Sequence, residues 1–210
     1  MTRPGYRGDP FAGVPGRRLF VGVPLPSSAV QSIVEVVESV RAMGLPSGDR
    51  DVRWVRLDGL HITLRFIGPT LDDRVEPVAE AVRAVAAAAA GPIDVEIGGT
   101  GTFPSPHRPR SLWLGLRSGV DELAALAADV DAALERLGMT FVTRPFRPHL
   151  TLARSDGIRA GALVADRLAA ALGDRTIPFV VDDVGLFESV TGGGPARYVP
   201  VTSAPLGSMR

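Results

Sequence analysis

The sequence predicts an α+β protein with two pseudo-symmetric lobes that face each other across a cleft. Strand-like and helix-like segments alternate along the 210 residues, in a series that occurs twice. Two short motifs also occur twice and in the same order: Leu-aromatic-apolar-Gly-apolar at 19–23 and 112–116, and His-apolar-Thr-Leu at 61–64 and 149–152. We therefore expect an internal duplication that generates two similar lobes.

The composition indicates a globular protein with an apolar core, because 45% of the residues are hydrophobic and 22% are charged. The 23 basic residues, all Arg, are balanced by 23 acidic ones, so no net positive field captures long nucleic acids. The absence of Cys excludes disulfides, thiolate metal sites and a Cys nucleophile. We attribute the absence of Lys to a GC-rich coding sequence.

The chain is expected to form a single domain over residues 17–206, preceded by a disordered leader at 1–16 and followed by a frayed tail at 207–210. The leader is rich in Gly and Pro and lacks the apolar core of a signal peptide. The longest apolar stretch, 82–90, contains Arg83 and is too short to span a bilayer. We expect a cytoplasmic monomer without membrane contacts.

Five elements are expected in the first half. Apolar strand formers bounded by Pro or Gly indicate strands, and Val residues at helical spacing indicate helices. These elements are a strand at 19–23, a helix from a capping Ser27 or Ser28 to Gly44, a strand at 60–67 closed by Gly68-Pro69, a helix at 72–90 capped by Asp72, and a half-exposed strand at 93–97.

The second half repeats the alternation after a stretch rich in Gly and Pro at 98–109, which we expect to interrupt the strands. The expected elements are a strand at 111–116, a helix at 120–137, a strand at 149–153, a helix at 163–172, one long strand at 177–188, and a final strand at 198–201.

Two of the three His residues begin the repeated His-x-Thr-Leu motif. Because alternate residues of a strand share a face, His61 and Thr63 point to one side, and so do His149 and Thr151. If a pseudo-twofold axis relates the lobes, two imidazoles and two hydroxyls meet in the cleft. The third, His107, lies in a Pro-rich segment without a following Thr, and we expect it on the surface of a loop.

Two imidazoles and two hydroxyls suit phosphoryl chemistry. One imidazole can accept a proton near neutral pH while the other donates one, and Thr hydroxyls can donate hydrogen bonds to phosphate oxygens. This chemistry needs no metal or other cofactor. A zinc site built on the two His residues is the alternative, but the sequence offers no third ligand at a typical spacing.

Arg residues flank the two motifs, and we expect some of them to attract anions to the cleft. Strict alternation puts Arg65 on the His61 face but Arg154 on the face opposite to His149, unless the strand twists or ends near Ala153. The Arg residues concerned are Arg53, Arg56, Arg65, Arg108, Arg110, Arg144, Arg147, Arg154 and Arg159.

The two motifs resemble the paired His-x-Thr-x motifs of the two-histidine (2H) phosphoesterase superfamily. Flanking segments are similar to its RNA 2′,3′-cyclic phosphodiesterases, once described as 2′-5′ RNA ligases. The similar segments are 18–21, 60–68, 112–115, 144–154 and 194–198. The resemblance implies a bilobal α+β fold in which each lobe has an antiparallel sheet and flanking helices, with the motifs on facing strands.

The resemblance also implies metal-independent hydrolysis of a terminal 2′,3′-cyclic phosphate to a 2′-phosphate. It makes His61 the proton donor and His149 the proton acceptor. Thr63 and Thr151 would hold the phosphate. Arg154 would contact it as well, although strict alternation places this side chain on the opposite face.

The substrate remains open between RNA ends, small cyclic nucleotides, a cyclic phosphate on ADP-ribose, and a 2′-5′ linkage made in reverse. Outside the enzyme class, the alternatives are a non-catalytic module that binds RNA 3′ ends and a scaffold that kept the fold.

Overall fold

The computed structural model describes residues 13–44, 51–140, 145–191 and 195–207. The expected leader therefore lies largely outside the described residues, as do Arg144, residues 192–194 and the last three residues of the expected tail. The helices are α1 (Ser27–Ala42), α2 (Asp72–Ala88), α3 (Val120–Arg136), α4 (Ile158–Leu172) and a short 3₁₀ helix, η2 (Leu57–Gly59).

The described strands form two antiparallel sheets. The first has the order β3-β1-β8-β9, and the second has the order β2-β6-β5-β4-β7. The strands are β1 (Arg17–Pro24), β2 (Val52–Trp54), β3 (His61–Thr70), β4 (Ile93–Ser105), β5 (Arg108–Ser118), β6 (Leu150–Ser155), β7 (Ile177–Val181), β8 (Asp183–Val190) and β9 (Arg197–Pro205).

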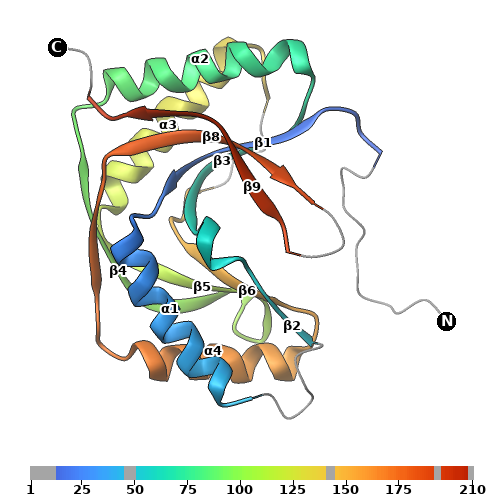
Figure 1. The fold of residues 1–210 in the computed structure, drawn as a ribbon, viewed down its shortest axis with the longest axis vertical. Coiled ribbons are helices and arrows are strands. Elements are labelled where there is room, and N and C mark those ends of the chain that lie inside the picture. The colour runs from blue at the N-terminus through green and yellow to red at the C-terminus, as the bar shows by residue number, and fades with distance from the viewer. Residues whose placement is uncertain (1–12, 45–50, 141–144, 192–194, 208–210) are drawn as a thin grey trace.

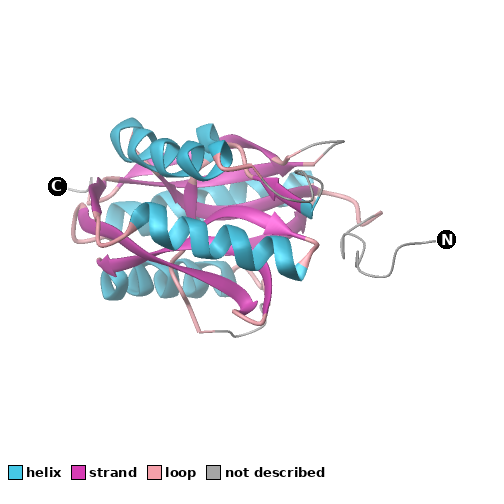
Figure 2. Cartoon of the chain, turned by 90° about the horizontal axis from the view of Figure 1, so that it is seen from below, coloured by secondary structure: helices cyan, strands magenta, loops and turns pink. Residues whose placement is uncertain are grey.

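Each sheet carries two helices, so the structure has the two α+β lobes that the sequence predicts. Helices α2 and α3 pack on the first sheet, and α1 and α4 pack on the second (Figure 1). Viewed from below, a helix lies in front of the strands (Figure 2). We call the two units lobe A (β3, β1, β8, β9, α2, α3) and lobe B (β2, β6, β5, β4, β7, α1, α4).

The lobes do not coincide with the two halves of the sequence. The order β3-β1-β8 in lobe A corresponds to β6-β5-β4 in lobe B, so each sheet combines strands from both halves. Helix α1 follows β1 of lobe A but packs in lobe B, whereas α3 follows β5 of lobe B but packs in lobe A. Each lobe therefore needs segments that are distant in sequence.

Two expectations about the strands are wrong. The Gly/Pro-rich stretch 98–109 is not an interruption but the turn end of the hairpin of β4 and β5, which accommodates these residues at register shifts after Ile97 and Phe103. The expected long strand at 177–188 is two strands, β7 and β8, which belong to different sheets. The chain passes from lobe B to lobe A at Asp182.

Several element boundaries also differ from the expected ones. Neither Ser27, Ser28 nor Asp72 caps its helix, because the residues at the cap positions are Pro26 and Leu71, without a side-chain hydrogen bond. The other differences are that β3 continues through Gly68 and Pro69 to Thr70, that α4 begins at Ile158 rather than at residue 163, and that β2 and η2 were not expected.

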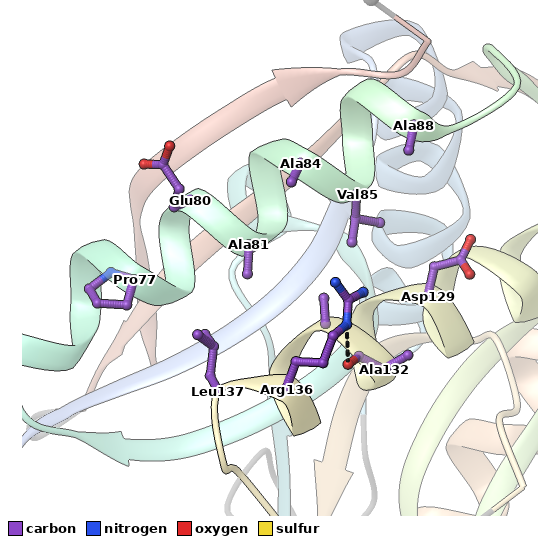
Figure 3. A pocket seen from close by; sticks show the side chains of 11 residues that line it. Pro77, Glu80, Ala81, Ala84, Val85, Ala88, Asp129, Ala132, Arg136 and Leu137 are labelled. Atoms are coloured by element: carbon purple, nitrogen blue, oxygen red, sulfur yellow. Dashed lines mark hydrogen bonds between the residues drawn. The ribbon is translucent and has the colours of Figure 1, made fainter.

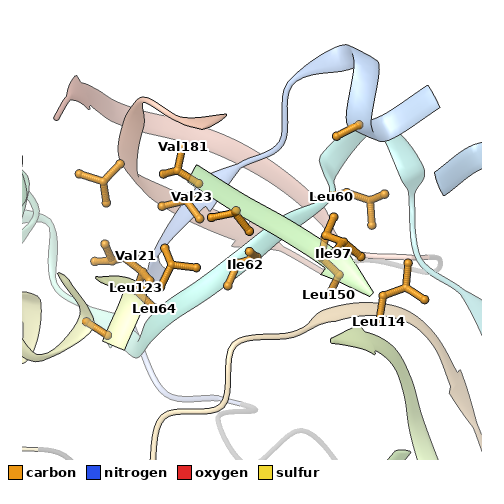
Figure 4. Packing of buried hydrophobic residues seen from close by; sticks show 14 of the residues in the cluster. Val21, Val23, Leu60, Ile62, Leu64, Ile97, Leu114, Leu123, Leu150 and Val181 are labelled. Carbon is orange, nitrogen blue, oxygen red and sulfur yellow. The ribbon is translucent and has the colours of Figure 1, made fainter. Parts of the chain in front are cut away.

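The apolar residues of the repeated motifs hold the two sheets in a common core (Figure 4). Ile62 and Leu150, which lie between the His and the Thr of their motifs, are completely buried. Leu64 and Leu152 are buried as well. Because neighbouring residues of a strand point to opposite faces, this burial turns His and Thr away from the core.

Helix α4 lies so close to β5 that a side chain at Gly161 has no room. A Cβ atom there would be 2.6 Å from the carbonyl oxygen of Pro109, which belongs to the backbone and cannot rotate away. We predict that Gly161→Ala lowers the free energy of unfolding by about 1–3 kcal/mol, measured by urea denaturation. Helix propensity alone predicts a gain of about 1 kcal/mol, and that result would contradict the packing argument.

Candidate active site

Five predicted site residues line one small cavity between the lobes. Its volume is about 90 Å³, and its lining comprises Val55, Gly59, Leu60, His61, Thr63, His149, Thr151, Arg154 and Tyr198. Strand β3 supplies His61 and Thr63. Thr151 and Arg154 lie on β6, and His149 immediately precedes that strand. The cavity thus brings together both imidazoles, both Thr residues and one guanidinium.

The two imidazoles are held in the same way. In each case Nδ1 lies at hydrogen-bond distance from the carbonyl oxygen two residues earlier, 2.8 Å for His61 to Gly59 and 2.7 Å for His149 to Arg147. A carbonyl oxygen only accepts, so Nδ1 carries a proton and donates it. The other nitrogen, Nε2, is therefore the atom of each ring that can exchange a proton with a substrate.

The surroundings favour the neutral form of both rings. Burial lowers the pKa of His61 below the usual 6.5, and the charge of His149 acts in the same direction. Burial also lowers the pKa of His149, and the positive charge of Arg154 adds to this effect. In both cases the hydrogen bond to the backbone carbonyl offsets part of the lowering.

Aromatic side chains surround each imidazole in a matched arrangement. The ring of His61 lies 4.6 Å from Phe20 and meets the edge of Tyr198 at 4.7 Å and 81°. The ring of His149 lies 6.0 Å from Trp113 and meets Phe103 at 4.9 Å and 82°. Phe20 and Trp113 occupy equivalent places in the repeated motif at 19–23 and 112–116.

A bulge in β6 places Arg154 on the cavity side. Opposite β6, Trp113 pairs with Thr151 and Leu112 pairs with Ala153, so Leu152 has no partner on β5. The extra residue reverses the alternation, and Arg154 shares the face of Thr151. Strict alternation, which assigns Arg154 to the opposite face, is wrong here, because it assumes one partner per residue.

The same bulge in β3 removes Arg65 from the cavity side. Leu64 has no partner on β1, and Arg65 instead forms an ion pair with Asp131 of α3. The position equivalent to Arg154 is occupied by Phe66, which is 40% exposed. The guanidinium of Arg18 lies 5.9 Å from the centre of the Phe66 ring. The expectation that Arg65 shares the face of His61 is therefore wrong.

Of the Arg residues near the motifs that the structure describes, only Arg154 lines the cavity. Arg53 is paired with Asp156 at 3.3 Å, and Arg56 with Asp58 at 2.5 Å. Arg110 donates to the carbonyl oxygens of Ser155 and Asp156. His107 is exposed in the turn between β4 and β5, as the sequence predicts.

Sequence reasoning missed Tyr198 and Gly59 as parts of the site. Tyr198 belongs to the segment 194–198 that carries the resemblance, but nothing in the sequence indicates that β9 brings it to His61. The role of Gly59 is performed by its backbone carbonyl, which leaves no signature in the sequence.

A larger cavity lies between α2 and α3, on the outside of lobe A (Figure 3). Its volume is about 580 Å³, and Ala side chains such as Ala81 and Ala84 form much of its lining. It contains neither an imidazole nor a hydroxyl, so it offers no equivalent of the acid–base pair in the small cavity.

In the part of the chain that the structure describes, no helix is long and apolar enough to cross a membrane. Within the same residues, no group of three or more His, Asp or Glu side chains is arranged to hold a metal ion.

Comparisons with known proteins agree on one family. The sequence profile of the 2′-5′ RNA ligase superfamily matches residues 26–193. The RNA 2′,3′-cyclic phosphodiesterase of Aeropyrum pernix is 34% identical over 170 residues, which cover 79% of this chain and 90% of that protein. The protein of the same name from Geobacillus stearothermophilus is 38% identical over 136 residues, and the match spans 41% of its length.

Solved structures confirm the fold. The TT0787 protein of Thermus thermophilus has a TM-score of 0.70 and 24% identity, with 90% of this chain and 98% of that chain covered. The structure of E. coli LigT complexed with 3′-AMP has a TM-score of 0.67 and 24% identity, with the same coverage. The predicted bilobal α+β class is therefore correct.

The lowered pKa values of the two imidazoles predict how stability depends on pH. An imidazole whose pKa is lower in the folded chain binds fewer protons there than in the unfolded chain. The free energy of unfolding should therefore fall as the pH decreases through about 6.5 towards the folded pKa values. Chemical denaturation at a series of pH values measures this dependence.

The double variant His61→Gln/His149→Gln is the control for this experiment. It removes both titrating rings, so its stability should depend less steeply on pH than that of the wild type between about pH 6.5 and 5. Equal slopes for the two proteins would contradict the prediction.

Proposed function

This chain belongs to the 2′-5′ RNA ligase superfamily, and we propose that it hydrolyses terminal RNA 2′,3′-cyclic phosphates to 2′-phosphates. One observation carries the proposal: two imidazoles, each with Nδ1 bound to a backbone carbonyl, line one cavity together with two Thr residues and Arg154. Proton transfer to and from opposite sides of a phosphorus atom needs such a pair. The names of the relatives point to the same substrate.

The reaction starts with His149 neutral and His61 protonated. Water attacks the phosphorus atom and gives a proton to Nε2 of His149, while the bond from phosphorus to the 3′ oxygen breaks. Nε2 of His61 gives its proton to this departing oxygen, which becomes the 3′ hydroxyl. The product is a 2′-phosphomonoester, and one proton has moved from His61 to His149.

The charge of Arg154 supports the assignment of His149 as the base. Arg154 lowers the pKa of His149, which favours the neutral ring that a base requires. A neutral His149 no longer repels a proton on His61, so the pair can hold one proton on the donor. The Thr63 and Thr151 hydroxyls and the Arg154 guanidinium would hold the phosphate oxygens, where negative charge gathers.

The size of the cavity supports RNA ends or small cyclic phosphates as substrates. A volume of about 90 Å³ suits a phosphoryl group, whereas a nucleoside must lie outside it. The zero net charge of the chain fits recognition of one terminal group rather than of a long backbone. The proposed chemistry uses protons alone, so it requires no metal and no protein partner.

Incubation with an oligonucleotide ending in a 2′,3′-cyclic phosphate tests the proposal. We expect a 2′-phosphate end, and we expect a chelator to leave the rate unchanged. The His61→Ala and His149→Ala variants should each lose about 10²- to 10⁴-fold in kcat, because each removes one proton-transfer group. Circular dichroism controls for folding.

Three results would contradict the proposed function or its mechanism. An unchanged cyclic end after long incubation would favour a module that only binds RNA ends. A 3′-phosphate product would show that the bond from phosphorus to the 2′ oxygen breaks instead of the bond to the 3′ oxygen. If a chelator abolished the activity and zinc restored it, the metal-free mechanism would be wrong.

The pH profile of kcat/KM should be bell-shaped, with its maximum below pH 6.5. At low pH the base His149 is protonated, and at high pH the donor His61 is neutral, so the rate falls on both sides. The maximum lies between the two pKa values of the free enzyme, and burial lowers both of them below 6.5. Steady-state kinetics on the cyclic substrate give this profile.

Arg154→Gln gives a matched variant for the pH profile. Without the cation, the pKa of His149 rises towards 6.5, and the acidic limb of the profile moves to higher pH. A maximum above pH 7 in the wild type, or an acidic limb that does not move in the variant, would contradict the assignment.

A further inference from the structure

We propose that Tyr198 is a further residue of this site: its ring positions His61, and its hydroxyl donates a hydrogen bond to a phosphoryl oxygen of the bound substrate. The inference rests on the proposed function, because it assigns the hydroxyl to the same phosphate. Tyr198 is not among the site residues expected from the sequence.

The fold brings Tyr198 to the cavity from the far end of the chain. It lies near the start of β9, the edge strand of the first sheet, where it pairs with Ser189 of β8. It lines the cavity together with both imidazoles and both Thr residues. Phe20 supports its ring at 5.2 Å and 80°, so the side chain is packed on the His61 side of the site.

The ring of Tyr198 contacts the imidazole of His61 and lies beside Gly59, the residue whose carbonyl orients that imidazole. Its edge meets the imidazole at 4.7 Å, and a Cβ atom on Gly59 would be only 3.1 Å from its Cδ2 atom. The carbonyl oxygen of Gly59 accepts the Nδ1 proton of His61. Tyr198 therefore packs against the imidazole and beside the residue that holds it, which restricts rotation of the imidazole.

The hydroxyl of Tyr198 suits a hydrogen-bond donor. Burial raises its pKa above 10, so it stays protonated throughout the pH range of the proposed reaction. Arg154 acts on the phenol in the opposite direction, and its side chain lines the same cavity as Tyr198. Among the described residues, no hydrogen bond is found that uses this hydroxyl.

Tyr198 also removes the symmetry between the two imidazoles. Phe103 stands edge-on to His149 as Tyr198 does to His61, at 4.9 Å and 82° against 4.7 Å and 81°. Phe103 has no hydroxyl. Of these two matched positions, the one beside His61 therefore carries the hydroxyl, and His61 is the imidazole to which we assign protonation of the departing oxygen.

Two substitutions separate the roles of the hydroxyl and of the ring. Tyr198→Phe keeps the ring and should lower kcat/KM on the cyclic substrate by about 10- to 100-fold, with the pH of the maximum unchanged. Tyr198→Ala removes the ring that buries His61, so the pKa of this imidazole should rise towards 6.5. NMR titration of the imidazole measures this shift. Phe103→Ala is the matched control, and it should move the titration of His149 instead.

The outcomes are decisive for each part. Wild-type kcat/KM in Tyr198→Phe would overturn the role of the hydroxyl. An unchanged titration of His61 in Tyr198→Ala, or the same shift in Phe103→Ala, would overturn the positioning role. A loss confined to folding is recognised by circular dichroism, and the isosteric Tyr198→Phe variant then still tests the hydroxyl.

Binding of inorganic phosphate tests the inference separately from the proposed reaction. Phosphate is titrated into the wild type and into Tyr198→Phe while the imidazole resonances are observed. We expect the variant to bind phosphate about 10-fold more weakly, even if the wild type hydrolyses no cyclic phosphate. Equal affinities would overturn the inference, whereas an inactive wild type with unequal affinities would overturn only the proposed reaction.

Discussion

The hydrogen bond from each imidazole to the carbonyl two residues before it is the interaction on which the site depends. It fixes the proton on Nδ1 and leaves Nε2 as the atom that can meet a substrate. Both acceptors are backbone atoms next to the start of a strand, so the orientation of the rings follows from the path of the chain. The buried neighbours Ile62 and Leu150 fix that path by anchoring the strands in the core.

One unpaired residue immediately after the Thr of each motif decides which side chains join these imidazoles. Leu64 has no partner on β1, and Leu152 has none on β5. The resulting change in alternation places Phe66 of one lobe and Arg154 of the other at equivalent positions after the motif. The backbone is thus symmetric where the side chains are not. The same contrast holds for Tyr198 and Phe103. Two lobes with equivalent backbones can in this way hold two imidazoles with different roles in proton transfer.

The sequence was sufficient to predict the two lobes, most elements and the convergence of His61 and His149, because burial on alternate residues leaves a clear periodic pattern. It was insufficient where pairing between distant segments decides. The bulges in β3 and β6 are defined by their pairing with β1 and β5. The transfer of the chain at Asp182 depends on β7 and β8 joining different sheets, and the approach of Tyr198 depends on the position of β9. The Gly and Pro residues of 98–109 misled because register shifts accommodate them within a hairpin.

The exchange of segments between the lobes has a consequence for biosynthesis. The first sheet joins β1 and β3, from the beginning of the chain, to β8 and β9, from its end. On the ribosome, β1 and β3 emerge well before β8 and β9, so the first sheet cannot be completed until nearly the whole chain has been made. A nascent or truncated chain therefore lacks an assembled catalytic cavity, and activity begins only once translation is nearly finished.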